Sequence, residues 1–407
     1  MPDFLVGHAT HPDWRAALAL AAAQIDARSA AFEASAAGPL SLGFVYFSDH
    51  YAPQAEALVE ALRQRWPGVA WVGSVGVGIC AGSVEYMDQP ALALMLAALP
   101  VGRFEVFSGA HKLQRIEAFG ALVHADPATP ELPELIVELS DRTSSGYLFG
   151  GLASSRTGSV HVAQRALHGG LSGVAFTRDV GLVSRVTQGC QPVGPVREVT
   201  GCDRNLVTEL DGRPALDCLL ADLGLDGMAG LRGPGNHGAM ARLRATLVGL
   251  TDAQDTTIDR GGQFGTDVRV RHLIGLDPGR HAVAVADVPR RGMHAAFCQR
   301  DAQAARRDLV RICSEIRDEV ESPAVAALAS GPAAEAPRRM LGAVYVSCTG
   351  RGGAHFGGPS AELRTVQHAL AAGGDEVPLV GFFAAGEIAR HHLYGYTGVL
   401  TVFTGGH

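Results

Sequence analysis

The chain has 407 residues, of which 47% are hydrophobic and 18% are charged, a balance typical of a globular protein with sizeable buried cores. Its net charge of −7 argues against nucleic acid or an anionic membrane as the main partner, because both require a basic face on the protein. No apolar run is long enough to span a bilayer, and the N-terminus lacks the basic start and apolar stretch of a signal peptide. We therefore predict a cytoplasmic protein of about two domains.

The N-terminal part alternates between predicted helices and strands. Residues 11–32 are alanine-rich with few helix breakers, so we assign 1–40 to an N-terminal helix. Short apolar runs predict buried strands, and one amphipathic segment predicts a helix. These elements are strands at 42–47, 70–73 and 91–96, and a helix at 53–66.

The C-terminal part repeats this order, with a strand at 341–347, a helix at 359–371, and strands at 378–381 and 398–403. The motif Leu-Gly-x-Val-Tyr-x-Ser occurs at 42–48 and again at 341–347, and Gly-x4-Gly-Ile at 73–79 resembles Gly-x4-Gly-Glu-Ile at 381–388. We interpret the two regions as two copies of one unit. The predicted fold class is therefore α/β, with two related α/β domains of layered sheets and helices.

Further apolar segments at 173–176, 266–274 and 281–288 are predicted to add strands. We place the first domain at 41–225 and the second at 226–407. Within the second domain, "SPAVAALASGPAAEAP" at 322–337 is rich in alanine and proline and is predicted to be a flexible loop.

The cysteines and the lysine exclude several chemistries. The seven cysteines are dispersed without a Cys-x-x-Cys pair, which predicts reduced and mostly buried thiols. Lys112 is the only lysine, and it lies in neither a phosphate-binding loop nor a Schiff-base motif.

The stretch "VSCTGRGG" at 346–353 is the first candidate site. Cys348 ends an apolar run, and Gly350 and Gly352 flank Arg351 in a turn whose backbone N–H groups could bind an anion. Cys348 would be a nucleophile only if a partner lowered its pKa. An enzyme using Cys348, a thiol in a pocket wall and a buried structural thiol all remain open, as does an Arg351 that pairs with a structural carboxylate.

The second candidate is the stretch 381–388, which contains Gly381, Phe382, Gly386 and Glu387. Glu387 follows a small-residue turn after a buried strand, the end of an α/β sheet at which ligands commonly bind. Its carboxylate could bind an amine or pair with an arginine, and a purely structural pair is the alternative. The first copy has no acidic counterpart of Glu387, so we expect the C-terminal domain to carry the site.

The sixteen histidines show no His-x3-His or His-Glu-x-x-His spacing, so a zinc site is not predicted. Haem needs only one axial histidine, and His294 and His355 are the candidates.

Six blocks in order resemble the FIST family, named for F-box and intracellular signal transduction proteins. They are "YLFGGLAS" (147–154), "GCQPVGP" (189–195), "ELDGRPAL" (209–216), "GMHAAFCQRDAQAARRDL" (292–309), "GAVYVSCTGRG" (342–352) and "VPLVGFFAAGEI" (377–388). The resemblance extends over about 42–403 and implies an N-terminal and a C-terminal FIST domain in a stand-alone, bacterial-type member.

The resemblance also implies a function. FIST domains are proposed to bind small ligands such as amino acids in signalling, and some bacterial members are described as haem-binding nitric-oxide sensors that regulate a partner histidine kinase. The family's motif positions fall on the eight residues Cys348, Gly350, Arg351, Gly352, Gly381, Phe382, Gly386 and Glu387.

We therefore expect a non-enzymatic sensory protein for an amino acid or similar metabolite. Arg351 would hold an anionic group of the ligand, Glu387 a cationic group, and Cys348 would line the wall. The alternatives are a haem-based nitric-oxide sensor that acts on a histidine kinase, and an enzyme that uses Cys348.

Overall fold

The computed structural model describes residues 4–33, 38–225, 227–228, 237–252, 268–321, 338–371 and 374–405. The chain divides into two compact units, of which unit 1 comprises Met1–Thr187 and Arg306–His407 and unit 2 comprises Gln188–Ala305. The boundary predicted between residues 225 and 226 falls inside unit 2, so the compact units follow a different division. The physical reason is that strands from both ends of the chain pair within the sheets of unit 1. The predicted loop at 322–337 lies outside the described residues.

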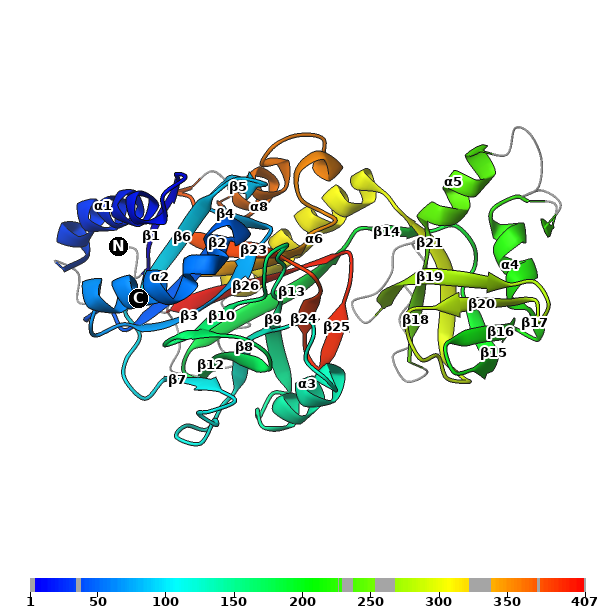
Figure 1. Cartoon of the computed structure of the whole chain (residues 1–407), viewed down its shortest axis with the longest axis horizontal. Helices are drawn as coiled ribbons and strands as arrows, with labels where there is room; N and C mark the ends of the chain where they lie inside the picture. Colours follow the sequence, from blue (N-terminus) through cyan, green and yellow to red (C-terminus); the bar gives the residue numbers. More distant parts are fainter. Residues whose placement is uncertain are drawn as a thin grey trace. The chain divides into compact units, whose positions relative to one another are not determined.

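Unit 1 contains three six-stranded sheets with one common strand order (Figure 1). Sheet 1 runs β1 (Phe4–Thr10), β6 (Ala91–Ala97), β2 (Leu42–Ser48), β3 (Ala70–Gly76), β10 (His161–Ala163) and β11 (Ala166–Leu167). Sheet 2 runs β7 (Phe104–Ser108), β12 (Leu171–Phe176), β8 (Gly120–Ala125), β9 (Tyr147–Leu152), β24 (Glu387–Ala389) and β25 (His392–Tyr394). Sheet 3 runs β13 (Gly181–Gln188), β26 (Thr397–Gly405), β22 (Arg339–Cys348), β23 (Leu379–Ala384), β4 (Gly78–Ala81) and β5 (Val84–Met87).

Each sheet is built around one copy of a repeat, in the order strand, helix, parallel strand, hairpin and antiparallel strand. Copy 1 spans residues 42–97, copy 2 spans 120–176 and copy 3 spans 339–405. Their helices are α2 (Ala55–Arg65), α3 (Leu132–Asp141) and α8 (Ala361–Ala371), and the short 3-10 helices η1 (Asp49–Gln54) and η3 (Gly353–Phe356) precede the first and the last of these. The predicted internal repeat is confirmed, with the correction that the unit occurs three times.

The hairpins are exchanged cyclically among the three copies. The hairpin of copy 1 pairs with β23 of copy 3, that of copy 2 with β3 of copy 1, and that of copy 3 with β9 of copy 2. A glycine occupies the equivalent place on each central strand, at Gly73, Gly150 and Gly381. A Cβ atom there would lie 1.7 to 1.9 Å from a carbonyl oxygen of the neighbouring strand, so the close approach of the strands requires glycine at all three places.

The repeated Leu-Gly-x-Val-Tyr-x-Ser motif requires a correction. It aligns Tyr46 with Tyr345, but the register pairs Val45 with Gly73 and Tyr345 with Gly381, so the structural match is shifted by one residue. Side chains alternate between the two faces of a strand, so this shift exchanges the faces. Tyr46 therefore points into the inner core, whereas Tyr345 points toward α8.

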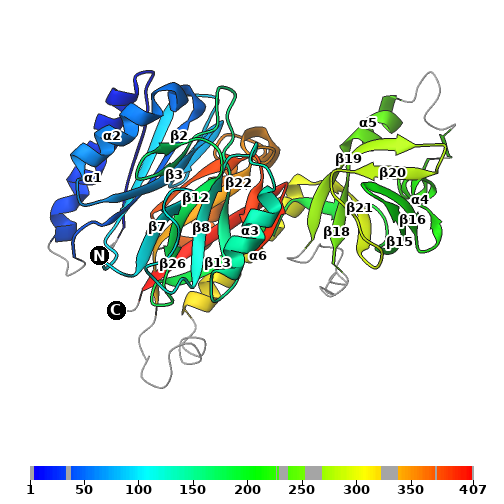
Figure 2. The ribbon, with the colours of Figure 1, turned by 60° about the horizontal axis from the view of Figure 1, so that its bottom comes forward.

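The inner faces of the three sheets share one core, and the helices lie outside (Figures 1 and 2). α1 (Trp14–Glu33) and α2 cover sheet 1 through an apolar cluster that includes Val45 and Phe47. α3 covers sheet 2, and α6 (Ala302–Glu321) and α8 lie beside sheet 3. The segment 1–40, predicted to be an N-terminal helix, contains α1 and, before it, β1. Among the described residues, no helix is both long enough and apolar enough to cross a membrane.

Unit 2 is an antiparallel sheet that closes on itself, because β18 pairs with both β19 and β21. A turn at Asp211 and Gly212, with φ of 50° and 71°, joins β16 to β17. The strands are β14 (Cys190–Pro192), β15 (Arg197–Asp203), β16 (Leu206–Leu210), β17 (Arg213–Pro214), β18 (Thr246–Thr251), β19 (Arg269–Asp277), β20 (Ala282–Val285) and β21 (His294–Arg300), and the helices are α4 (Ala215–Asp222) and α5 (His237–Ala245).

Candidate functional site

A buried polar cluster lies where β22 ends in unit 1. Cys348 is the last residue of β22, and a turn closes directly behind it through a hydrogen bond from Arg351 N to Cys348 O at 2.8 Å. Thr349 N donates to Ala384 O at 3.0 Å and so ties the start of the turn to the end of β23. The end of this parallel strand pair therefore holds the arginine close to the sheet.

Arg351 faces inward, with 1% of its surface exposed. Its Nε donates to Glu362 Oε1 at 2.9 Å, and its guanidinium carbon lies 5.1 Å from the ring centroid of Phe356. Glu362 also accepts hydrogen bonds from Tyr345 Oη at 2.7 Å and from Ser347 Oγ at 3.1 Å. The arginine thus pairs with a structural carboxylate, the alternative left open by the sequence.

The first turn of α8 is held by a residue from another copy. Glu85 of β5 accepts hydrogen bonds from the backbone N–H groups of Gly353, Glu362 and Leu363, at 3.1 to 3.3 Å. A carboxylate at this end of a helix satisfies N–H groups that have no partner within the helix. The position of Glu362, and therefore that of Arg351, depends on the hairpin of copy 1.

Glu387 begins β24 and is fully buried. Its Oε2 accepts hydrogen bonds from the backbone N of Thr397 at 3.0 Å and from Thr397 Oγ1 at 2.8 Å. Burial raises the pKa of Glu387 to about 8, against the opposing effect of its hydrogen bonds and the Arg351 charge. At neutral pH this carboxyl group is therefore mostly protonated, and the Arg351–Glu362 pair is balanced without it.

Cys348 is buried close to Glu387. Burial and then the Glu387 charge raise the pKa of Cys348 to about 12. A thiol with this pKa is protonated at neutral pH, and the thiolate is the nucleophilic form. This property argues against the alternative of an enzyme that uses Cys348.

Three atoms of the cluster are buried without a hydrogen-bond partner among the described residues: Arg351 Nη1, Arg351 Nη2 and Glu387 Oε1. Most buried polar atoms in proteins have a partner, and an unmet hydrogen bond costs about 1–3 kcal/mol. Two donors and one carboxyl oxygen are therefore available to a small polar molecule.

The structure separates the eight predicted site residues into two groups. Cys348, Arg351 and Glu387 interact with one another, and Gly350 and Gly352 belong to their turn. Gly381 serves the close approach of two strands, and a Cβ on Gly386 would lie 3.1 Å from Leu393. Phe382 stacks on Tyr46 in the inner core, with ring centroids 5.3 Å apart.

The sequence analysis missed the residues that complete the cluster, which are Glu85, Tyr345, Ser347, Glu362 and Thr397. One signal was available for two of them. Tyr345 and Ser347 are two residues apart on a predicted strand, so their side chains lie on the same face of the sheet. A face that packs against a helix is normally apolar, so two polar side chains there are a signal.

The two haem candidates lie in different units. His294 begins β21 of unit 2, and His355 lies in η3 of unit 1, with its ring edge-on to Phe356 at 5.5 Å. Among the described residues, no group of three or more His, Cys, Asp or Glu is placed to share a metal ion.

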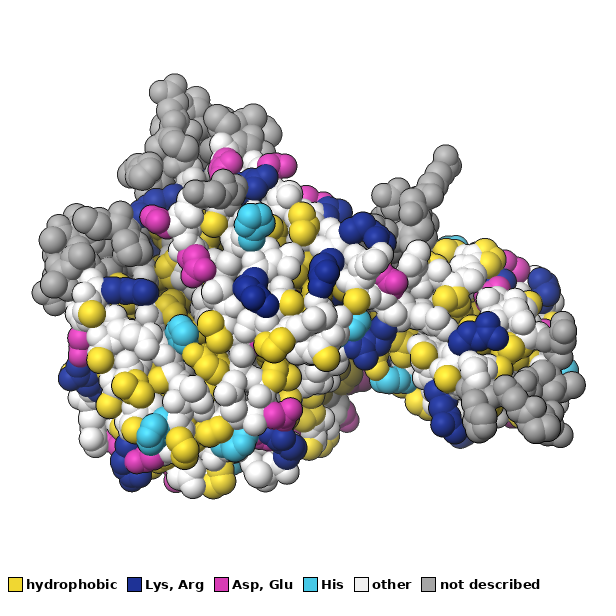
Figure 3. Space-filling view, turned by 90° about the horizontal axis from the view of Figure 1, so that it is seen from above, with side chains coloured by type: hydrophobic (Ala, Val, Ile, Leu, Met, Phe, Trp, Pro, Cys, Tyr) yellow, Lys and Arg dark blue, Asp and Glu magenta, His cyan; other side chains and the backbone are white. Residues whose placement is uncertain are grey.

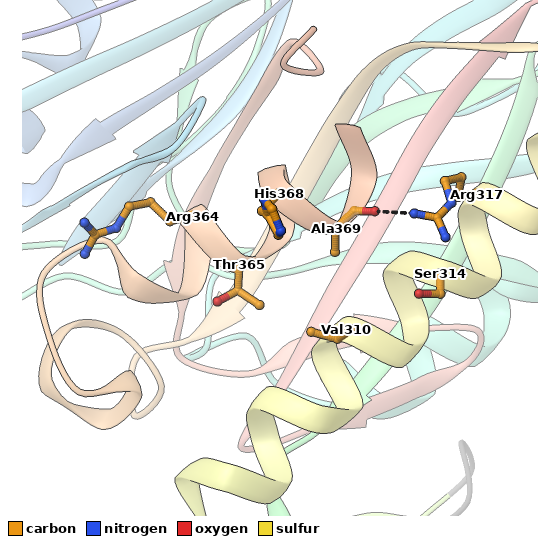
Figure 4. A pocket seen from close by; sticks show the side chains of 7 residues that line it. All are labelled: Val310, Ser314, Arg317, Arg364, Thr365, His368 and Ala369. Atoms are coloured by element: carbon orange, nitrogen blue, oxygen red, sulfur yellow. Dashed lines mark hydrogen bonds between the residues drawn. The ribbon is translucent and has the colours of Figure 1, made fainter. Parts of the chain in front are cut away.

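An open groove of about 850 Å³ lies between α6 and α8 (Figure 4). Arg317 crosses it to donate to Ala369 O at 3.2 Å, while Arg364 turns away and donates to the backbone oxygens of Pro359 and Ser360. None of the eight predicted site residues lines this groove. On the face seen in Figure 3, basic, acidic and apolar side chains of the described residues are interspersed.

Known proteins match nearly the whole chain. The FIST N domain matches residues 41–213, and the FIST C domain matches residues 215–390. An uncharacterized protein of Mycobacterium tuberculosis is 31% identical, and an uncharacterized protein of Mycobacterium bovis is 30% identical, each over 98% of both chains. The solved structure of T. maritima PurL complexed with ATP aligns with 98% of this chain and 71% of that one, at 10% identity and a TM-score of 0.24. FIST domains are associated with signal transduction and small-ligand sensing, and this chain belongs to the FIST family.

Proposed function

We propose that this protein is a sensor that binds a small zwitterion, an amino acid in the first instance, at Arg351, Cys348 and Glu387. The observation that carries the proposal is the set of buried atoms without partners, Arg351 Nη1, Arg351 Nη2 and Glu387 Oε1. A ligand carboxylate would accept from the two guanidinium nitrogens, and a ligand ammonium would donate to the carboxyl oxygen. Both groups of an amino acid would then be paired, which a buried charge requires.

Charge balance favours a zwitterion over an anion. Arg351 is already neutralised by Glu362, so a simple anion would bring an uncompensated negative charge into a buried site. A zwitterion adds no net charge, and its ammonium group would replace the proton of Glu387. Binding below about pH 8 would therefore release a proton.

Access and output complete the proposal. Arg351 and Glu387 are sealed from solvent, so the turn at 349–357 would open for entry and close over the ligand. This movement at the surface would carry the signal to a separate protein, for which a histidine kinase is our proposed partner. The protein would act in the cytoplasm without catalysing a reaction.

The test is binding of the common amino acids, measured by thermal shift and then by calorimetry in buffers of different ionisation enthalpy. We expect one amino acid to bind with proton release, and its decarboxylated and deaminated analogues to bind at least about tenfold more weakly. Glu387→Gln should remove binding and leave the ligand-free protein folded. An analogue without its ammonium group that binds as tightly as the amino acid would refute the zwitterion site.

The haem alternative has a direct test of its own. An absorption spectrum before and after addition of haemin would show a sharp Soret band if haem binds. Its loss on replacing His294 or His355 would identify the axial ligand and displace the amino acid proposal.

A further inference from the structure

β7 of sheet 2 lies beside β3 and β10 of sheet 1 (Figures 1 and 2). A cleft of about 1000 Å³ opens there. All five residues of β7 line it, together with much of the segment 109–116 and the end of β10. Its walls include the apolar side chains of Phe104, Val106 and Ile116. This cleft shares no residue with the cluster around Arg351.

The cleft is basic, although the whole chain is acidic. Its lining contains Arg63, Arg115, Arg165 and Lys112, the only lysine of the sequence. The one carboxylate of the lining, Glu105, accepts hydrogen bonds from the backbone N of Gln114 at 3.3 Å and of Arg115 at 2.7 Å. Four cations therefore face one carboxylate that is already engaged by the backbone.

Three of these cations have no acidic partner among the residues that the structure describes. Arg63 pairs with Glu60 at 3.2 Å. Within the described residues, Lys112, Arg115 and Arg165 make no ion pair, and all three side chains are exposed. Like charges that gather without counter-charges repel one another, so an anion bound in the cleft would relieve an unfavourable arrangement.

The equivalent place between sheets 2 and 3 shows how the fold fills such a cleft. There β13 lies near β9, and the cavity measures only about 230 Å³. Arg185 of β13 donates to Glu315 at 3.3 Å and to Glu319 at 2.5 Å, both on α6. Copy 2 has no helix between β7 and β8, where residues 109–119 form an irregular segment. The larger cleft therefore lacks the carboxylates that a helix supplies to the smaller one.

We propose that this cleft binds a small organic anion that carries two or more phosphate or carboxylate groups on an apolar body. Guanidinium groups bind both kinds of acid through paired, charge-assisted hydrogen bonds, and the ammonium of Lys112 adds a mobile point charge. Phe104, Val106 and Ile116 provide the apolar wall that small-molecule sites commonly combine with a few polar groups. The site is independent of the proposed amino acid site.

The experiment is calorimetric titration of the whole protein with pyrophosphate, citrate and adenosine diphosphate at low salt. We expect at least one probe to bind, and the double variant Lys112→Ala/Arg115→Ala to lower its affinity by about tenfold or more. Arg165→Ala should weaken it as well. Binding of pyrophosphate without citrate would identify phosphate as the recognised group, and the reverse would identify carboxylate.

Two controls separate a site from general attraction. Arg291→Ala removes an exposed arginine of unit 2 and should leave the affinity unchanged, as should Glu387→Gln. All the basic residues replaced are exposed, so the melting temperatures of the variants should match that of the unmodified protein. No binding of any probe at millimolar concentration, or equal weakening by Arg291→Ala, would overturn the proposal.

Discussion

Copy 1 and copy 3 share one backbone plan and differ in what they place between sheet and helix. Val45 and Phe47 of copy 1 point into an apolar cluster beneath α1 and α2. At the equivalent places copy 3 has Tyr345 and Ser347, which bind Glu362. The hairpins differ likewise, since Ile79 of copy 1 corresponds to Glu387. The two copies share their backbone geometry, but between sheet and helix copy 3 has polar side chains where copy 1 has apolar ones.

The largest expected effect comes from Glu362→Gln. The variant keeps the shape of the side chain but leaves the buried Arg351 without its counter-charge, which costs about 3–5 kcal/mol. Urea denaturation should show a much lower midpoint. The matched control is Glu56→Gln, because Glu56 is the second residue of α2 as Glu362 is of α8, yet it is exposed. The control should change the free energy of unfolding by less than about 0.5 kcal/mol. If the two variants lowered it equally, the buried pair of Arg351 and Glu362 would contribute nothing to stability.

The three equivalent glycines test the repeat itself. Gly73→Ala, Gly150→Ala and Gly381→Ala should each place a Cβ against a carbonyl oxygen and cost about 1–3 kcal/mol or more. Thermal melts would measure the losses side by side. The control is Gly68→Ala, because a Cβ at Gly68 would meet no atom within 4 Å and the loss of stability should be small. Gly212→Ala is unsuitable as a control, because the φ of Gly212 is 71° and any side chain there would strain the backbone. If the substitution at one of the three positions left the melting temperature unchanged, the strands of that copy would not require glycine there.

Glu387 should make stability depend on pH in an unusual direction. Its folded-state pKa of about 8 lies above the ordinary value of 4.5 for a glutamate, so the folded protein binds this proton more tightly than the unfolded chain does. Stability should therefore fall as pH rises between those two values, by up to about 1.4 kcal/mol per pH unit from this group. Glu387→Gln should remove this part of the slope in urea titrations across that range. Parallel curves for the two proteins would show that the carboxyl is not held protonated.

The smallest expected effect is the reaction of Cys348 with iodoacetamide. Its pKa of about 12 leaves almost no thiolate at neutral pH, so mass spectrometry should find this residue unmodified in the folded protein. Cys202 is less buried and serves as an internal comparison that should react sooner. Rapid labelling of Cys348 alone would instead favour the enzyme alternative.

The sequence predicts the elements of copies 1 and 3 well, because apolar runs such as those of β2 and β6 are strong signals for buried strands. It does not reveal copy 2, whose strands lack the repeated motif and share only the glycine at 150. The one-residue shift at Tyr345 is also hidden, because the repeated letters do not show which residue of the strand pairs with Gly381.

The candidate site could be predicted only in part. The motif identifies Arg351 and Glu387. Glu362 lies in the first turn of a helix, where an acidic residue is ordinarily explained by the helix dipole. The sequence therefore does not show that Glu362 pairs with Arg351. Glu85 lies far away in the sequence, and only the exchanged hairpin brings it to α8. Contacts of this kind follow from topology, which local patterns do not encode.

The exchanged hairpins also bear on how the chain is made. The β4–β5 hairpin leaves the ribosome roughly 300 residues before its partner β23, so sheet 3 can close only when synthesis is nearly complete. Until then the hairpin presents unpaired strand edges, the kind of surface that promotes aggregation. Cutting the gene at the boundary between the FIST N and FIST C domains would make this condition permanent. Each half would retain a hairpin that pairs with the other half, so the parts of the two family domains that lie in unit 1 depend on each other to complete their sheets.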